Sequence, residues 1–366
     1  MRLTIWRAVV LGVLLGVLTL PSAEFRLLAQ QQQPPIRVPD PQAPKKDQDQ
    51  KDQKKKPEGE FGITVEVPLV NLEVVATDTD GNTITGLRKI NFQVFEDGVQ
   101  QQITNFSPTE SAITTVMLIE FSKLGYEIFA YNALDWADQF TSQLKKDDWV
   151  ALVSFDLRTR IEVDFTQNKL DIRNYLSHMI FPGFSEANLF DAVIETVDRI
   201  QDLKGRKSIL VLASGLDTFS KHTLDDVLKR LRQTDVTIFS VGVAHAFANY
   251  MDAHRRLGDI GRLNFYQAEN QLKSFAEMTG GRGFFPQFQG EIPDIMREVA
   301  AFLRAQYSLG YSPSNQNRDG KFRKIKVVLV GDDGNPLVMN NQKGKKVKIV
   351  VYARQGYNAP KGGVSD

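Results

Sequence analysis

The apolar segment Val116–Ile119 leads directly into two residues that carry reactive groups, Glu120 and Ser122. The segment has the character of a buried β-strand, and a helical pattern follows the polar residues. In a parallel α/β sheet, the carboxyl ends of the strands deliver side chains to a crevice where ligands bind. The carboxylate of Glu120 and the hydroxyl of Ser122 are therefore predicted to stand on a ligand-binding edge.

Motifs for covalent or phosphate chemistry are missing from the rest of the sequence. The chain has no cysteine, and its four histidines form no His-x-x-x-His pair. Ser214 lacks the Gly-x-Ser-x-Gly frame of a nucleophile elbow. The run Gly280–Gly283 lacks the Lys-Ser/Thr of a phosphate-binding loop and is predicted to be a tight turn. The sequence favours a protein that is not an enzyme, with a hydrolase as the weakest alternative.

The charge balance gives no support to nucleic-acid binding. The 366 residues include 45 Lys and Arg against 44 Asp and Glu, so no global field would attract phosphates. The N-terminus has the pattern of a secretory signal, with Arg2 and Arg7 before the apolar stretch 8–20. Cleavage is expected after Ala23 or Ala29, and an uncut membrane anchor is the alternative. No later segment is apolar enough to span a bilayer, so the predicted location is secreted, periplasmic or cell-envelope.

Changes in composition along the chain predict six segments. The stretch 30–60 is rich in Gln, Pro and Lys and has almost no large apolar residues, so we expect a disordered linker. The full division is: 1–29 signal peptide, 30–60 linker, 61–110 N-terminal β region, 111–306 α/β domain, 307–358 C-terminal β region and 359–366 tail.

Alternating strand and helix patterns in the middle of the chain predict a doubly wound, mostly parallel α/β sheet. Its expected strands are Ile113–Ile119, Trp149–Phe155, Arg160–Phe165, Lys207–Ala213, Val236–Val243 and Gly283–Pro286. Its expected helices are Tyr126–Leu144, Leu170–His178, Leu189–Leu203, Thr223–Gln233, Asn270–Met278 and Glu291–Gln306. Several strands are apolar throughout, which is typical of central strands that helices cover on both faces.

The two β regions are predicted to pair into one sandwich that flanks the α/β domain. Turn signals such as Asp97-Gly98 and Asp333-Gly334 mark hairpins within them. The C-terminal strands are expected at Tyr307–Tyr311, Lys321–Val330 and Lys345–Ala353. Each half alone has too few strands to bury a core, so a shared sandwich is favoured over two separate units.

The α/β segment resembles the von Willebrand factor A domain, a Rossmann-like fold. The resemblance rests on the strand that ends at Glu120-Phe-Ser122, on Leu189-Phe-Asp191-Ala192, and on the strands Lys207–Gly215 and Val236–Val243. The flanks, Asn91–Gly98 and Tyr307–Pro313 followed by Gly320–Val327, are similar to secreted A-domain-related proteins of Acidobacteria.

The resemblance also implies a metal site, from which this chain departs. Many A domains bind Mg²⁺ or Mn²⁺ through an Asp-x-Ser-x-Ser motif, a Thr and a second Asp, because such ions need oxygen ligands. Here Glu120 replaces the first Asp, Ser122 is kept, Leu124 replaces the second Ser, Ala187 aligns with the Thr and Ser214 replaces the last Asp. The expectation is a degenerate site without a bound cofactor, and the alternative is an unorthodox Mg²⁺ or Mn²⁺ site.

Loops at the same edge are expected to meet a protein partner whose identity the sequence leaves open. The candidate residues on this face are Phe184, Asp217, Phe219, His245 and Phe247. Aromatic side chains are enriched at binding hot spots, although packing within the loops is an equal alternative. The leading hypothesis is thus a non-enzymatic adhesion-type interaction protein. The alternatives are a metal-dependent adhesin and a structural envelope protein, and the oligomeric state is open.

Overall fold

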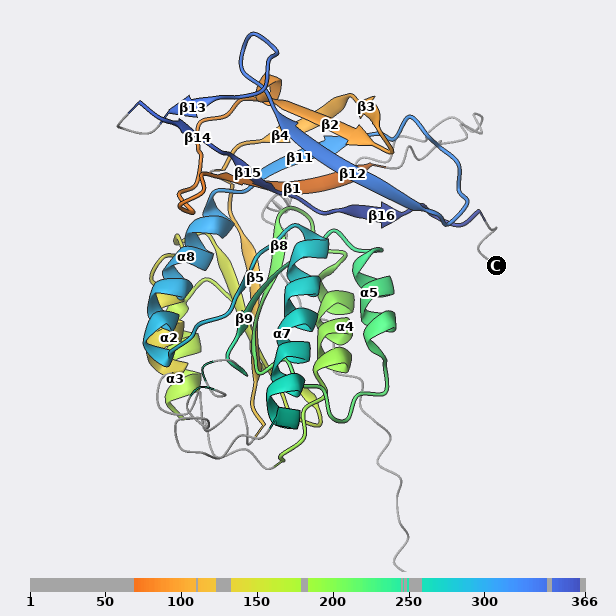
Figure 1. The fold of residues 1–366 in the computed structure, drawn as a ribbon. Helices are drawn as coiled ribbons and strands as arrows, with labels where there is room; N and C mark the ends of the chain where they lie inside the picture. Colours follow the sequence, from red (N-terminus) through yellow and green to blue (C-terminus); the bar gives the residue numbers. More distant parts are fainter. Residues whose placement is uncertain are drawn as a thin grey trace, which may run out of the picture. The chain divides into compact units, whose positions relative to one another are not determined.

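The middle part of the sequence forms a six-stranded sheet with the strand order β10-β9-β8-β5-β6-β7 (Figure 1). The computed structural model describes residues 69–109, 111–122, 133–178, 184–244, 246, 249, 259–340 and 344–362. The strands of this sheet are β5 (Thr114–Glu120), β6 (Trp149–Phe155), β7 (Thr159–Thr166), β8 (Lys207–Ala213), β9 (Thr237–Gly242) and β10 (Gly283–Phe284). All neighbours are parallel except β6 and β7, so the prediction of a mostly parallel sheet is confirmed.

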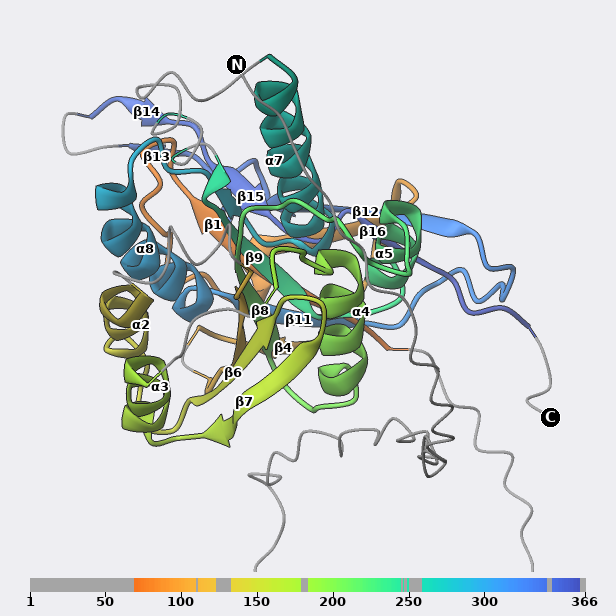
Figure 2. The same ribbon diagram turned by 90° about the horizontal axis from the view of Figure 1, so that it is seen from below.

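Helices cover both faces of the sheet (Figures 1 and 2). One face carries α2 (Ala133–Thr141), α3 (Lys169–Ser177) and α8 (Ile292–Arg304), and the other carries α4 (Leu189–Ile200), α5 (Leu224–Leu231) and α7 (Asp259–Thr279). Side chains of β5 alternate between the two layers: Met117 and Ile119 join one core, and Val116 and Leu118 join the other. This two-sided burial explains why the strand is continuously apolar from Val116 to Ile119.

The segments before and after the α/β part build two antiparallel sheets, in the orders β15-β1-β11-β4 and β16-β12-β2-β3. N-terminal β1 pairs with C-terminal β11 and β15, and β2 pairs with β12. Both sheets contribute to one core that includes Leu72, Val94 and Leu329. The predicted joint β unit is therefore confirmed. Its elements are β1 (Val70–Thr77), η1 (Lys89–Asn91), β2 (Phe92–Glu96), β3 (Val99–Gln101), β4 (Ile103–Ser107), β11 (Tyr307–Tyr311), β12 (Phe322–Leu329), β15 (Val350–Tyr352) and β16 (Gly356–Asn358).

Three predicted elements differ from those observed. Helix α7 begins at Asp259, eleven residues before the predicted start, because a glycine at position 261 and interspersed polar residues weaken the helical pattern of its first turns. The single strand predicted at 345–353 is two strands, since β14 (Lys346–Val347) pairs with β13 (Met339–Asn340) whereas β15 pairs with β1. Helix α2 covers only the C-terminal part of the helix predicted at Tyr126–Leu144, whose residues 126–132 lie outside the described ranges. A short 3-10 turn, η2 (Gln289–Glu291), precedes α8.

No helix among the described residues is long and apolar enough to cross a membrane. The predicted signal peptide and linker lie outside those residues.

Candidate functional site

The carboxylate of Glu120 stands at the end of β5 and is buried, with 1% of the residue exposed. Its Oε1 accepts a hydrogen bond of 2.5 Å from the Ser122 hydroxyl, and its Oε2 accepts one of 2.7 Å from the backbone N–H of Ser214. Burial raises the pKa of Glu120, and the hydrogen bonds from Ser122 and Ser214 oppose that rise. Both carboxylate oxygens are thus engaged inside the protein, where they join the end of β5 to the loop after β8.

A hydroxyl does lie beside Ala187, but it belongs to Thr218. The Ala187 N–H donates to Thr218 Oγ1 over 2.8 Å, and that hydroxyl and the Thr218 N–H both lie within hydrogen-bond distance of the Ala187 carbonyl. The Thr218 side chain therefore fixes the backbone before α4. Nothing in the sequence pattern singled out Thr218 for this contact.

The first turn of α4 is capped by a loop that follows β8. The Asn188 side chain at the N-cap makes no capping hydrogen bond, which leaves the first helical N–H groups to other partners. Asp217 Oδ1 accepts from the Phe190 N–H over 3.1 Å, and Ser220 Oγ accepts from the Asp191 N–H over 3.1 Å. Ser220 in turn donates to Asp217 over 2.5 Å. A loop distant in sequence thus replaces the usual local cap.

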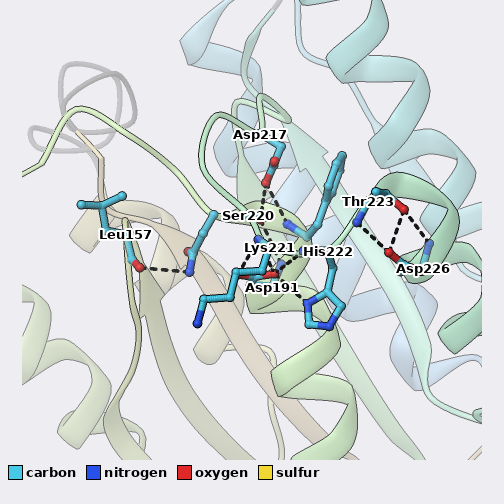
Figure 3. Close-up of polar contacts among 10 residues, drawn as sticks. Leu157, Asp191, Asp217, Ser220, Lys221, His222, Thr223 and Asp226 are labelled. Carbon is cyan, nitrogen blue, oxygen red and sulfur yellow. Dashed lines mark hydrogen bonds and ion pairs between the residues drawn. The ribbon is translucent and has the colours of Figure 1, made fainter. Parts of the chain in front are cut away.

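The side chain of Asp191, in the first turn of α4, binds the same loop (Figure 3). Its Oδ1 and Oδ2 accept from the Lys221 N–H over 3.1 and 3.0 Å, and Oδ1 also lies 3.0 Å from the His222 N–H and 2.8 Å from His222 Nδ1. Burial on its own would raise the pKa of Asp191, but these hydrogen bonds outweigh it and lower that pKa. Lys221 and His222 were not sequence candidates, because their contribution is mainly a backbone N–H.

A third carboxylate at this edge, Asp156, is also engaged. Arg160 Nη1 and Nη2 donate to its two oxygens over 2.9 and 3.0 Å, and Asp156 is only 2% exposed. Its carbonyl accepts from the Asn188 N–H, and the Asn188 side chain donates to the Leu157 carbonyl. Asp156 therefore supports the loop before α4.

A comparison of the sequence with known protein families is consistent with the α/β fold. Residues 116–278 match the model of the von Willebrand factor type A domain. This segment is an A domain. A search of curated protein sequences finds no significant match.

Several solved structures are similar to the chain at low sequence identity. A von Willebrand factor type A protein from Catenulispora acidiphila is 10% identical over 80% of this chain and 75% of its own, with a TM-score of 0.43. The vWF domain of the type V pili tip protein Mfa5 from Porphyromonas gingivalis is 10% identical over 52% and 94%, with a TM-score of 0.39. Proximal thread matrix protein 1 from the mussel byssus, with a zinc-occupied MIDAS motif, is 15% identical over 56% and 48%, with a TM-score of 0.40. The chain thus spans about half the length of the mussel protein.

The described part of the A-domain edge offers few oxygen ligands for Mg²⁺ or Mn²⁺. These ions need several oxygen ligands that are free to face them. Both oxygens of Glu120 already accept protein hydrogen bonds, Ala187 contributes a methyl group, and Ser214 supplies no carboxylate. Within the described residues no group of three or more Asp, Glu or His is arranged to hold a metal ion. Leu124 lies outside those residues.

Two aromatic side chains are exposed on the A-domain loops. Phe184 is 42% exposed and Phe219 is 67% exposed. Phe219 lies in the loop held by Asp217 and Ser220, so its backbone is tied to α4. The other two candidates on this face, His245 and Phe247, lie outside the described residues.

Proposed function

We propose that the A domain is a non-enzymatic, adhesion-type interaction module that binds a protein partner without a metal ion. The whole chain would be a secreted or envelope-associated protein of the kind abundant in Acidobacteria, which its flanking strands resemble. One observation carries the proposal: the two oxygens of Glu120 are held by Ser122 and by the Ser214 N–H. A carboxylate bound in this way stabilises the fold in the place where other A domains coordinate a cation.

The loop around Phe219 supplies the contact surface in this proposal. Asp191 and Asp217 fix its backbone through hydrogen bonds to α4, so an exposed aromatic ring is presented with little conformational freedom. Binding then costs less ordering entropy, because the loop is already in place. A large apolar ring is also the type of side chain that dominates interface energies. A-domain proteins are typically interaction modules, which supports the same reading.

Metal titration tests the first half of the proposal. The full chain is titrated calorimetrically with Mg²⁺, Mn²⁺ and Zn²⁺, and we expect no stoichiometric binding. A variant with Glu120→Asp, Ala187→Thr and Ser214→Asp restores three family ligands and is the positive control for folding and binding. Micromolar binding by the natural chain that Glu120→Gln abolishes would contradict the proposal.

Crosslinking on the native envelope tests the second half. The wild-type chain, Phe219→Ala and Leu170→Ala are compared by mass spectrometry of the crosslinked products. Leu170 is the matched control, since it is 60% exposed and lies in the first turn of α3. We expect one protein to crosslink to the wild type and to Leu170→Ala and to be lost with Phe219→Ala. An unchanged crosslinking pattern in Phe219→Ala would rule out this face.

A further inference from the structure

A cavity of about 790 Å³ lies at the opposite end of α4 from the loops described above. Its walls come from the start of β1, the residues that follow α4 and α5, the loop 313–318 and the segment 354–360. The volume falls in the range of small-molecule sites, roughly 300–1,000 Å³. The cavity shares no lining residue with the A-domain loops, so an inference drawn from it is independent of the proposed function.

Arg354 lines this cavity as a buried cation without an acidic partner. It is 8% exposed, its Nε donates to the Gly356 carbonyl over 3.1 Å, and its Nη2 donates to the Arg232 carbonyl over 3.4 Å. Its guanidinium carbon also lies 6.0 Å from the centroid of the Tyr357 ring, and among the described residues Arg354 forms no ion pair. Asp235 is the acidic wall residue with the largest electrostatic effect on Arg354, and it is already paired with Lys207 Nζ at 2.8 Å. A buried guanidinium in this state is costly, and an anionic ligand would offset the cost.

Side-chain amides are the most frequent polar groups in the rest of the wall. Seven of the eighteen lining residues are Asn or Gln. The side chains of Asn71, Gln233 and Asn358 make no hydrogen bond to any residue that the structure describes. Each amide offers two donors and an acceptor, which matches neighbouring hydroxyl groups that both donate and accept. The wall therefore offers hydrogen-bonding groups to a ligand with many hydroxyls, beside apolar surface from residues such as Leu69 and Pro360.

We propose that this cavity binds an acidic saccharide, a hydroxyl-rich ligand that carries a carboxylate. The guanidinium of Arg354 pairs with the carboxylate, an arrangement that is charge-assisted and directional. Asn71, Gln233 and Asn358 hold the sugar hydroxyls. A neutral sugar would leave the charge of Arg354 unmatched. Arg318 and Asp202, both exposed, also line this cavity.

Calorimetric titration of the full chain tests this site with three probes: tetragalacturonate, tetramannuronate and a hyaluronan tetrasaccharide. We expect at least one to bind with one molecule per chain. Gln233→Ala should weaken that binding about fivefold, the loss of one hydrogen bond. Gln100→Ala is the matched control, an exposed glutamine on β3, and should leave the affinity unchanged. Arg354→Gln should abolish binding, with circular dichroism as the check on its fold.

Three results would overturn the proposal. The first is the absence of binding by all three probes. The second is equal binding of a probe whose carboxylates have been reduced to alcohols, because Arg354 would then have no role in recognition. The third is tighter binding of a tetrapeptide with a free C-terminal carboxylate, which would make the cavity a peptide site. If Arg354→Gln does not fold, Gln233→Ala and Asn71→Ala, both at exposed positions, decide the outcome through the affinity of the bound probe.

Discussion

Asp191 in the first turn of α4 receives three hydrogen bonds from the backbone of Lys221 and His222, and a fourth contact joins it to His222 Nδ1. The reverse contacts run from the α4 N–H groups to Asp217 and Ser220. Helix and loop therefore cap each other. A surface loop held in this way behaves as part of the domain framework, which is the property that a preformed binding surface needs.

Replacing Asp191 with alanine should destabilise the protein by about 2 kcal/mol, because two backbone N–H groups lose a charged acceptor. Urea denaturation monitored by fluorescence measures the change in the free energy of unfolding. Asp225→Ala is the control, since the Asp225 side chain is 67% exposed and forms a surface ion pair with Lys229, so we expect a change below about 0.5 kcal/mol. An Asp191→Ala value as small as the control would show that the mutual cap contributes little.

Glu73 in β1 should make the protein less stable as the pH rises from 5 to 8. Burial raises its pKa from 4.5 to about 7, against the opposing effects of the Ser308 hydrogen bond and of Arg206. A carboxyl with a raised folded-state pKa binds its proton more tightly when folded, so stability is highest below pH 4.5 and falls until about pH 7. The decrease should be on the order of 2 kcal/mol.

The variant Glu73→Gln checks this assignment, because a neutral amide does not titrate. Its free energy of unfolding should vary less between pH 5 and pH 8 than that of the wild type. Glu195→Gln, at an exposed position of α4, should keep the wild-type pH dependence. Identical slopes for the wild type and Glu73→Gln would exclude Glu73 as the source.

The sequence was sufficient to predict the sheet but not the state of the site. Strands β6 and β8 have the predicted bounds, because continuous apolar runs between turn signals mark strands buried on both faces. The inward position of the Glu120 carboxylate could not be predicted, since it depends on the N–H of Ser214, which lies 94 residues away. Similarly, Asp217 was predicted only as a residue of the partner-binding face, whereas its carboxylate accepts from the N–H of Phe190, 27 residues earlier. The local sequence pattern determines which residues lie at the edge of the sheet. Contacts between segments distant in sequence determine which atoms their side chains bind there.

Gly281 should tolerate no side chain. A Cβ at this position would lie 1.9 Å from the Ile238 carbonyl oxygen, a backbone atom that cannot move without disturbing β9. We expect Gly281→Ala to cost more than about 3 kcal/mol or to prevent folding. Gly290 is the control, because a Cβ there meets no atom within 4 Å. Thermal unfolding of the two alanine variants measures the difference, and equal melting temperatures would contradict the close approach.

Glu120→Ala should destabilise the protein more than Glu120→Gln. Alanine leaves the Ser214 N–H without an acceptor in a buried position and opens a cavity, with a cost of about 2–4 kcal/mol. Glutamine keeps the volume and one acceptor oxygen for Ser214, and its amide can donate to Ser122, so the cost at pH 5 should be about 1 kcal/mol.

The two Glu120 variants should also differ from the wild type in their response to pH. Burial raises the pKa of Glu120, so the free energy of unfolding of the wild type falls as the pH rises above 4.5. The glutamine variant does not titrate and lacks this decrease. The stability difference between the wild type and Glu120→Gln should therefore shrink between pH 5 and pH 8, as measured by urea denaturation at both values. A difference that grows with pH would mean that the ionised carboxylate is the preferred state, which is the state that a metal ion would require.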